Sequence, residues 1–331
     1  MSEAQNGMTT TPSPAGARPG PKRRRKRAPK LRATGKRFII SVIGEDRYVQ
    51  QRAARQIARG KPLLLVHTMG KVGSTSVAAS LKARGIKRTM TMYQPHFLSD
   101  EGIAFAEQLA INRAGSWQKL TRKGRAGYLR NRLLNKELKR LRANGGRVKA
   151  ITIVRDPLAT NLSGLFHNYR WWPAELKAQC DPPTPACLAA VERYFLDHYT
   201  HDVPDTWFDM EVRSVYGIDV FAEPFDPARG YAIYRNEFAD VLLLKLEMMN
   251  QCAAAAIGDF LGLENFVLQE SNVADDKEYA DIYAAFRREI TLPAAYLDRM
   301  YASRLAQRFY SPDEIAAFRR KWSAVRIAEP G

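Results

Sequence analysis

The chain of 331 residues has 52 Lys and Arg against 34 Asp and Glu, a formal net charge of +18, and 45% of its residues are hydrophobic. This apolar share is typical of a globular protein with a sizeable core. No apolar run reaches 18 residues and no apolar segment follows the N-terminal charges, so we expect neither a transmembrane helix nor a secretory signal.

The first segment, residues 1–37, is rich in Pro, Gly, Thr and basic residues and holds eleven Lys and Arg against one Glu. It can bury too little apolar surface to offset its chain entropy, so we predict a disordered basic tail. Its basic part, residues 18–37, would bind phosphates weakly, on nucleic acid or on an anionic membrane. The alternative is a solvated tail without a partner.

After the tail, apolar runs alternate with amphipathic stretches, and we expect one α/β domain over residues 38–331. Predicted strands cover 38–43, 63–67, 89–93, 148–154 and 241–247. Predicted helices begin after Asp46 and near Ser99, cover 75–84, 117–143 and 157–169, follow the last strand, and begin again at Ser311 with a capping box. Residues 170–235 are interpreted as irregular. The alternation predicts a three-layer α/β/α fold with a mostly parallel central sheet.

Three cysteines, Cys180, Cys187 and Cys252, are an odd number in a long chain. They favour free thiols in a reducing compartment, and therefore a cytoplasmic protein, with a peripheral place at the inner membrane face as an alternative. A disulfide or a metal site at Cys180 and Cys187 is the other interpretation of this spacing.

The segment 63–85, LLLVHTMGKVGSTSVAASLKARG, has the layout of a phosphate-binding loop: a buried strand, a glycine-containing loop and a helix. The backbone N–H groups and the positive helix end at such a junction favour phosphate or sulfate. Lys71 would add a positive charge, and it precedes Gly73, whereas the usual nucleoside-triphosphate loop has its lysine after that glycine. The other candidate anion ligands are Gly73, Ser74, Thr75 and Ser76. The alternative is an ordinary strand-to-helix turn with a hydroxyl cap.

A second candidate anion site lies in ITIVRDPLATNLSGLF, residues 151–166. Arg155 follows a buried strand at the edge where open α/β sheets bind ligands, and Ser163 lies two helical turns further on. Together they could hold a second phosphate, with Arg155 giving a forked contact. The alternative is an Arg–Asp surface pair beside a helical serine.

These two segments together resemble the sulfotransferases that use 3′-phosphoadenosine-5′-phosphosulfate (PAPS). TMGKVGST resembles their 5′-phosphosulfate loop, and the Arg155/Ser163 pair resembles their 3′-phosphate motif. LLLKLEMM and IGDFLGL are similar to later blocks of that family, within a resemblance that runs from about residue 61 to 322 and looks closest to bacterial carbohydrate or capsule-type members. The resemblance implies that Lys71 to Ser76 hold the phosphosulfate and that Arg155 and Ser163 hold the 3′-phosphate. PAPS would be the co-substrate, with no metal.

Sulfuryl transfer needs cations near the bridging oxygen and a base for the acceptor hydroxyl. Lys71 fits the first role. His96 follows the predicted strand 89–93 at the same sheet edge as the loop, and the resemblance favours it as the base. We interpret His67 as structural, and His198 and His201 lack a third metal ligand in the sequence. A packed loop histidine at position 96, with a Glu or Asp as the base, is the alternative.

The sequence thus predicts a sulfotransferase whose acceptor is an anionic or neutral glycan. The basic segment 112–149, with a net charge of +12, would attract an anionic acceptor, or it is simply a solvated helix. A nucleotide kinase or other nucleoside triphosphatase is one competing interpretation, although Ser74 stands where its lysine is expected. A non-catalytic nucleic-acid-binding protein that acts through the basic tail is another.

Overall fold

The computed structural model describes residues 60–269 and 278–323, with a few isolated positions between 44 and 55. The predicted tail over residues 1–37 and the predicted strand 38–43 lie outside the described residues. Only isolated positions of the helix predicted after Asp46 are described. Residues 49–331 form a compact unit, which holds the sheet and the helices around it.

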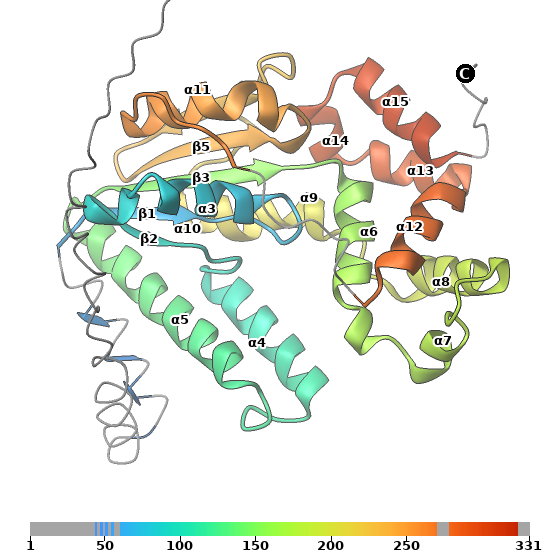
Figure 1. The fold of residues 1–331 in the computed structure, drawn as a ribbon. Helices are drawn as coiled ribbons and strands as arrows, with labels where there is room; N and C mark the ends of the chain where they lie inside the picture. The colour runs from blue at the N-terminus through green and yellow to red at the C-terminus, as the bar shows by residue number, and fades with distance from the viewer. Residues whose placement is uncertain are drawn as a thin grey trace, which may run out of the picture. The chain divides into compact units, whose positions relative to one another are not determined.

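A five-stranded sheet in the order β2-β1-β3-β5-β4 forms the centre of this unit, with helices on both of its faces (Figure 1). Its strands are β1 Leu63–Val66, β2 Thr91–Tyr93, β3 Val148–Val154, β4 Tyr231–Arg235 and β5 Ala239–Lys245. The first four in the order run parallel, and β4 pairs antiparallel with β5. The predicted three-layer α/β/α fold with a mostly parallel sheet is confirmed.

Buried strands explain why the sheet could be located from the sequence. Every residue of β1 is buried, and so are all residues of β3 and β5 except Lys149 and Asp240. Strands that are covered on both faces read as continuous apolar runs. β4 is mostly half-buried at the sheet edge, so its sequence lacks this signal and the strand was not predicted.

The helices before residue 170, the helix after β5 and the final helix follow the predictions within a few residues. Their bounds are α3 Ser74–Ala83, α4 Asp100–Ala114, α5 Arg122–Ala143, α6 Pro157–His167, α11 Met249–Leu261 and α15 Pro312–Trp322. The capping box at Ser311 and Glu314 is present. Between α11 and α15 lie α12 Ala280–Glu289, α13 Ala294–Tyr301 and α14 Arg304–Phe309.

The interpretation of residues 170–235 as irregular is wrong, because most of this segment is helical. It contains α7 Ala174–Ala178, α8 Pro185–His198, α9 Val203–Trp207, a π-helical turn Phe208–Arg213 and α10 Ser214–Tyr216. Proline begins α8 rather than breaking it, because Thr184 caps the helix and Pro185 occupies its first position. Val191 and Phe195 of this helix are fully buried, so packing stabilises it.

The last helix, α15, is tied to the carboxyl end of β5 by an ion pair whose lysine is buried. Lys245, with no exposed surface, donates hydrogen bonds from Nζ to Glu314 Oε1 at 2.7 Å and to the main-chain oxygen of Pro227 at 2.6 Å. Glu314 Oε2 also accepts from the Ser311 N–H at 2.9 Å. The same carboxylate therefore caps α15 and neutralises a buried cation, which fixes α15 beside the ligand-binding edge of the sheet.

Cys180 and Cys187 form a disulfide, with their Cα atoms 5.0 Å apart, so the expectation of free thiols is wrong for these two residues. Cys252 is a buried free thiol. The bridge joins Cys180, two residues after the end of α7, to Cys187 in the first turn of α8. Within the described part of the chain, no helix is both long enough and apolar enough to cross a membrane.

We expect reduction of this disulfide to lower the free energy of unfolding by about 2 kcal/mol, because the bridge restricts the unfolded chain. The measurement is urea denaturation with and without reductant. Cys180→Ser/Cys187→Ser, which cannot form the bridge, should match the reduced wild type and be insensitive to reductant. Three reactive thiols in the unreduced, denatured wild type would contradict the bridge.

Candidate functional site

A cavity of about 560 Å³ lies at the carboxyl ends of β1 and β3. Open α/β sheets bind ligands at this edge. Because β2, β1 and β3 are neighbours in the sheet, the segments that follow them meet at this cavity. All eight residues predicted as site residues line it: Lys71, Gly73, Ser74, Thr75, Ser76, His96, Arg155 and Ser163. The structure thus brings together residues up to 92 positions apart, from Lys71 to Ser163.

The loop between β1 and α3 has two residues in the left-handed backbone region. Gly73 has φ 81°, and Lys71, a non-glycine residue, has φ 70°. Left-handed residues in a loop turn neighbouring N–H groups to one side, as in anion-binding nests. A Cβ atom at Gly73 would also lie 2.7 Å from Leu246 Cδ1, so the leucine side chain would have to shift, and the backbone angle is what favours glycine there. Lys71 in this conformation costs about 1–2 kcal/mol, and such strain is concentrated at functional sites.

The first turn of α3 is open to an anion. Gly73 is its N-cap and supplies no side-chain cap, and the turn has no acidic residue. The hydroxyl cap of the alternative interpretation is therefore absent. Thr75 is exposed and Ser76 is half-buried, whereas Ser74 is buried and its Oγ accepts a hydrogen bond from Gln94 Nε2 at 3.0 Å. Gln94 thereby couples the loop to the segment that carries His96.

Arg155 connects the two predicted anion sites. Its Nη1 donates to the main-chain oxygen of Lys71 at 2.7 Å, so the guanidinium lies against the loop. The alternative of a surface pair with Asp156 does not hold, because Asp156 is buried and caps α6 by accepting from the Leu158 N–H at 3.0 Å. Ser163 lies two turns into α6 on the wall of the same cavity. Arg155 and Ser163 therefore face one space, as the eight-residue spacing predicted.

His96 is held by a single well-defined hydrogen bond. Its Nδ1 lies 2.7 Å from the main-chain oxygen of Thr68. A carbonyl oxygen only accepts, so Nδ1 carries the proton, and Nε2 of the neutral ring is the basic nitrogen. The residue has an exposed side toward the cavity, but the protein atoms packed around the ring desolvate it and lower its pKa below the ordinary 6.5. The hydrogen bond to Thr68 acts in the opposite direction and raises the pKa, whereas His67 and Lys71 lower it electrostatically.

His67, next to the loop, is structural in its surroundings. It is fully buried, with Nδ1 2.9 Å from the Tyr216 hydroxyl and Nε2 3.1 Å from Glu211 Oε2. Glu211 also accepts from the N–H groups of Leu98 and Ser99 at 2.7 and 3.0 Å. This buried cluster fixes the chain just after His96 against the end of β1.

His201, one of the two histidines of the segment DHYTHD, is bound within the fold. Its Nε2 lies 2.9 Å from the main-chain oxygen of Phe195, and its Nδ1 lies 2.9 Å from the Tyr296 hydroxyl. Both ring nitrogens are used within the fold. No group of three or more His, Cys, Asp or Glu side chains suited to a metal ion occurs among the described residues.

The cavity also has wall residues to which the sequence assigned no role. They include Thr160, Asn161, His167, Asn168 and Tyr199. Tyr199 approaches α6 so closely that a Cβ atom at Gly164 would lie 2.2 Å from its hydroxyl, and burial raises its pKa to about 12. Its hydroxyl is therefore a neutral donor at physiological pH. Asn161 and Gly164 belong to the segment 151–166, which the sequence identified as the second candidate anion site. Tyr199 comes from the segment that was interpreted as irregular.

Comparison with known proteins relates one part of the chain to a described family. Residues 188–311 match the family model NKWYS, whose description is "Putative capsular polysaccharide synthesis protein". The matched segment holds β4, β5 and the cavity residues Tyr199, Val203, Pro204 and Leu246, and leaves out the loop after β1. No curated protein and no solved structure matches the chain.

Proposed function

We propose that this protein is a PAPS-dependent sulfotransferase that modifies a carbohydrate hydroxyl. The observation that carries the proposal is the single cavity lined by both anion-binding segments and joined by the Arg155–Lys71 hydrogen bond of 2.7 Å. Its volume of about 560 Å³ lies within the usual range of ligand sites. The match of residues 188–311 to a capsular polysaccharide synthesis family supports a carbohydrate as the acceptor.

In the proposed reaction the acceptor oxygen attacks the sulfur of PAPS. The bond between sulfur and the bridging phosphate oxygen breaks, and its electron pair stays on that oxygen. Lys71 and the N–H groups at the start of α3 stabilise this charge, while Arg155 and Ser163 hold the 3′-phosphate. His96 Nε2 takes the proton of the acceptor hydroxyl. The products are the sulfated acceptor and adenosine 3′,5′-bisphosphate.

A nucleoside triphosphatase is the second candidate, and the cavity wall argues against it. Such an enzyme holds magnesium through an acidic side chain near its lysine. Among the described residues that line the cavity there is no Asp or Glu. The absence of a carboxylate in this wall also favours a histidine over a Glu or Asp as the base.

Adenosine 3′,5′-bisphosphate is expected to stabilise the protein against unfolding without added metal. At about 100 times its Kd, ligand binding contributes about 2.7 kcal/mol. The measurement is a thermal shift series with this nucleotide, with ATP plus magnesium, and with duplex DNA as parallel arms. A shift with ATP plus magnesium alone would favour the triphosphatase, and a shift with DNA alone would favour a nucleic-acid-binding protein. No shift with the bisphosphate at millimolar concentration would overturn the proposal.

A further inference from the structure

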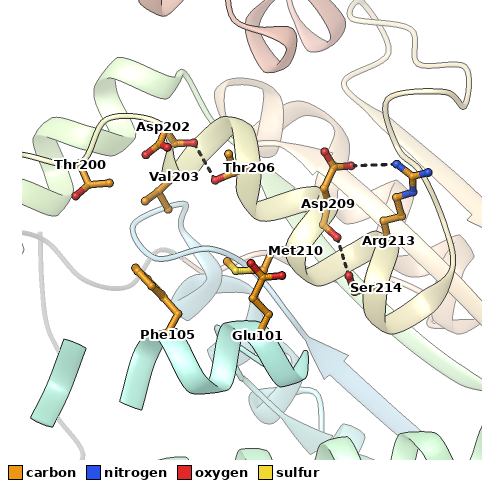
Figure 2. A pocket seen from close by; sticks show the side chains of 10 residues that line it. All are labelled: Glu101, Phe105, Thr200, Asp202, Val203, Thr206, Asp209, Met210, Arg213 and Ser214. Carbon is orange, nitrogen blue, oxygen red and sulfur yellow. Dashed lines mark hydrogen bonds and ion pairs between the residues drawn. The ribbon is translucent and has the colours of Figure 1, made fainter. Parts of the chain in front are cut away.

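We call the cavity that is lined by Lys71, His96 and Arg155 the candidate nucleotide cavity. A second hollow, of about 660 Å³, adjoins it, and we call this second hollow the α4 groove. Its lining residues are Glu101, Phe105, Thr200, Asp202, Val203, Thr206, Asp209, Met210, Arg213 and Ser214. Figure 2 shows Glu101 and Phe105 on α4 on one side and the segment 200–214 on the other. The two hollows share Val203 in their walls.

The groove also reaches the proposed base through the chain. Phe97 directly follows His96, and its ring lies 5.9 Å from the ring of Phe105. His96 does not line the groove itself, but the cavity that it lines meets the groove at Val203, so an acceptor in the groove has to extend past Val203 to reach the proposed base. The nucleotide segments around Lys71 and Arg155 do not line this groove, so the groove is available while a nucleotide is bound.

The groove combines an apolar face with hydrogen-bonding groups. Phe105, which lines the groove, is 45% exposed, and Met210 lines the groove as well. Exposed apolar side chains within a concave polar surface are typical of ligand sites. The hydroxyl groups of Thr200, Thr206 and Ser214 lie along the same wall. An apolar ring face beside hydroxyl and carboxylate groups suits a sugar, which has both apolar C–H faces and hydroxyl donors.

The charge of the groove selects among sugars. Its lining has three carboxylates and one guanidinium. Asp209 is neutralised by ion pairs with Arg304 and, at 3.9 Å, with Arg213. Among the described residues, the ion pairs at this groove involve Asp209 and Arg213, and none involves Glu101 or Asp202. Two uncompensated carboxylates repel an acidic glycan and accept hydrogen bonds from hydroxyl or ammonium groups.

The basic segment 112–149 does not offset this charge. Several of its cations are already paired on the helix surface: Arg132 with Glu107, Lys139 with Asp100, and Arg140 with Glu137. Asp100 and Glu107 belong to α4, so part of the positive charge of α5 holds the two helices together. None of the basic residues of α5 lines the groove.

We propose that the α4 groove binds the acceptor, and that the acceptor is a glycan without acidic groups, preferably one with a free amino group. The inference rests on the proposed function for what happens at His96, but the binding of the glycan itself does not depend on PAPS. It narrows the acceptor from an anionic or neutral glycan to a neutral or amino-bearing one.

The test compares three oligosaccharides of one length by calorimetry at physiological salt: a hexamer of glucosamine, a hexamer of N-acetylglucosamine and a hyaluronan hexasaccharide. The proteins are the wild type, Glu101→Gln/Asp202→Asn, Phe105→Ala and the control Glu237→Gln. Glu237 is an exposed carboxylate in the β4–β5 turn and does not line the groove. Because the chain has a net charge of +18, anions bind it at other places, so the deciding quantity is the change caused by each substitution.

The double variant is expected to bind the glucosamine hexamer about tenfold more weakly, the scale of one lost charge-assisted hydrogen bond. The hyaluronan Kd should stay the same or improve. Phe105→Ala should weaken both amino-sugar hexamers, and Glu237→Gln should behave as wild type. Three results would overturn the proposal. They are loss of hyaluronan binding in the double variant, equal glucosamine-hexamer binding in the double variant and the control, and no binding of either amino-sugar hexamer to the wild type. A parallel titration with adenosine 3′,5′-bisphosphate separates this outcome from failure of the proposed function.

Discussion

Replacement of Lys71 by alanine is expected to lower the turnover of sulfuryl transfer about 10²–10³-fold, the usual cost of removing one group that stabilises charge formed in the transition state. The affinity for adenosine 3′,5′-bisphosphate should change only a few-fold, because the charge on the bridging oxygen develops during transfer. The measurements are turnover with radiolabelled PAPS and nucleotide binding by calorimetry on the same preparation.

The unusual backbone at position 71 provides a control for this result. Lys71 has φ 70°, a region in which alanine is strained as lysine is, whereas glycine is not. Lys71→Ala therefore removes the charge and keeps the strain, and Lys71→Gly removes both. Equal losses of turnover in the two variants would assign the effect to the ammonium group. Recovery of turnover in Lys71→Gly would assign it to the loop conformation instead.

Arg155→Ala is expected to show the opposite pattern, with nucleotide binding weakened about ten- to hundredfold, as for a lost charge-assisted contact. Lys82→Ala is the matched control, because Lys82 is an exposed cation in the last turn of α3, at the far end from the loop. Equal effects of Lys71→Ala and Arg155→Ala on binding, with no difference in turnover, would contradict the separate roles.

The parts of the site that could be predicted from the sequence are those with local signals. The runs 63–67 and 148–154 are apolar because both faces of the sheet are covered, and the ends of these strands fix where Lys71 and Arg155 lie. The spacing from Arg155 to Ser163 needs only the geometry of α6. The parallel order then brings both segments to one edge.

The remaining parts depend on contacts between distant segments. Tyr199 reaches the cavity because α6 has Gly164 where any side chain would collide with the tyrosine hydroxyl. Apart from α8, the helices of residues 170–235 are short, so their stability comes from burial of residues such as Trp207 and Phe208. The α4 groove combines α4 with residues 200–214, and no local pattern indicates that pairing.

His96 was predictable from the sequence in its place but not in its hydrogen bonding, and its replacement gives the second large expected effect. His96→Ala should lower turnover about 10²–10⁴-fold, the usual contribution of a positioned base, with an unchanged Kd for adenosine 3′,5′-bisphosphate. Its place after β2 could be predicted, but the bond from Nδ1 to the Thr68 oxygen, which leaves Nε2 as the basic nitrogen, could not. The main-chain oxygen of His96 accepts from Trp207 Nε1 at 3.0 Å, and this contact survives the substitution.

The pH dependence of transfer tests the role of His96 separately from its position. A base acts in its neutral form, so turnover of the wild type should rise as pH increases through the pKa of His96 and then level off. Because burial lowers this pKa, the rise should lie below pH 6.5, and turnover should already be maximal at neutral pH. The rise should disappear in His96→Ala.

His167→Ala is the control, since His167 is the other histidine that lines the candidate nucleotide cavity in the described part of the chain. It should keep both the turnover and the acidic limb of the wild type. Turnover of His96→Ala within a few-fold of wild type would exclude His96 as the base, and loss of the limb in His167→Ala alone would assign the proton to His167. Asp202 in the adjoining groove would be the next base to test, because it is the carboxylate next to Val203, where the two hollows meet.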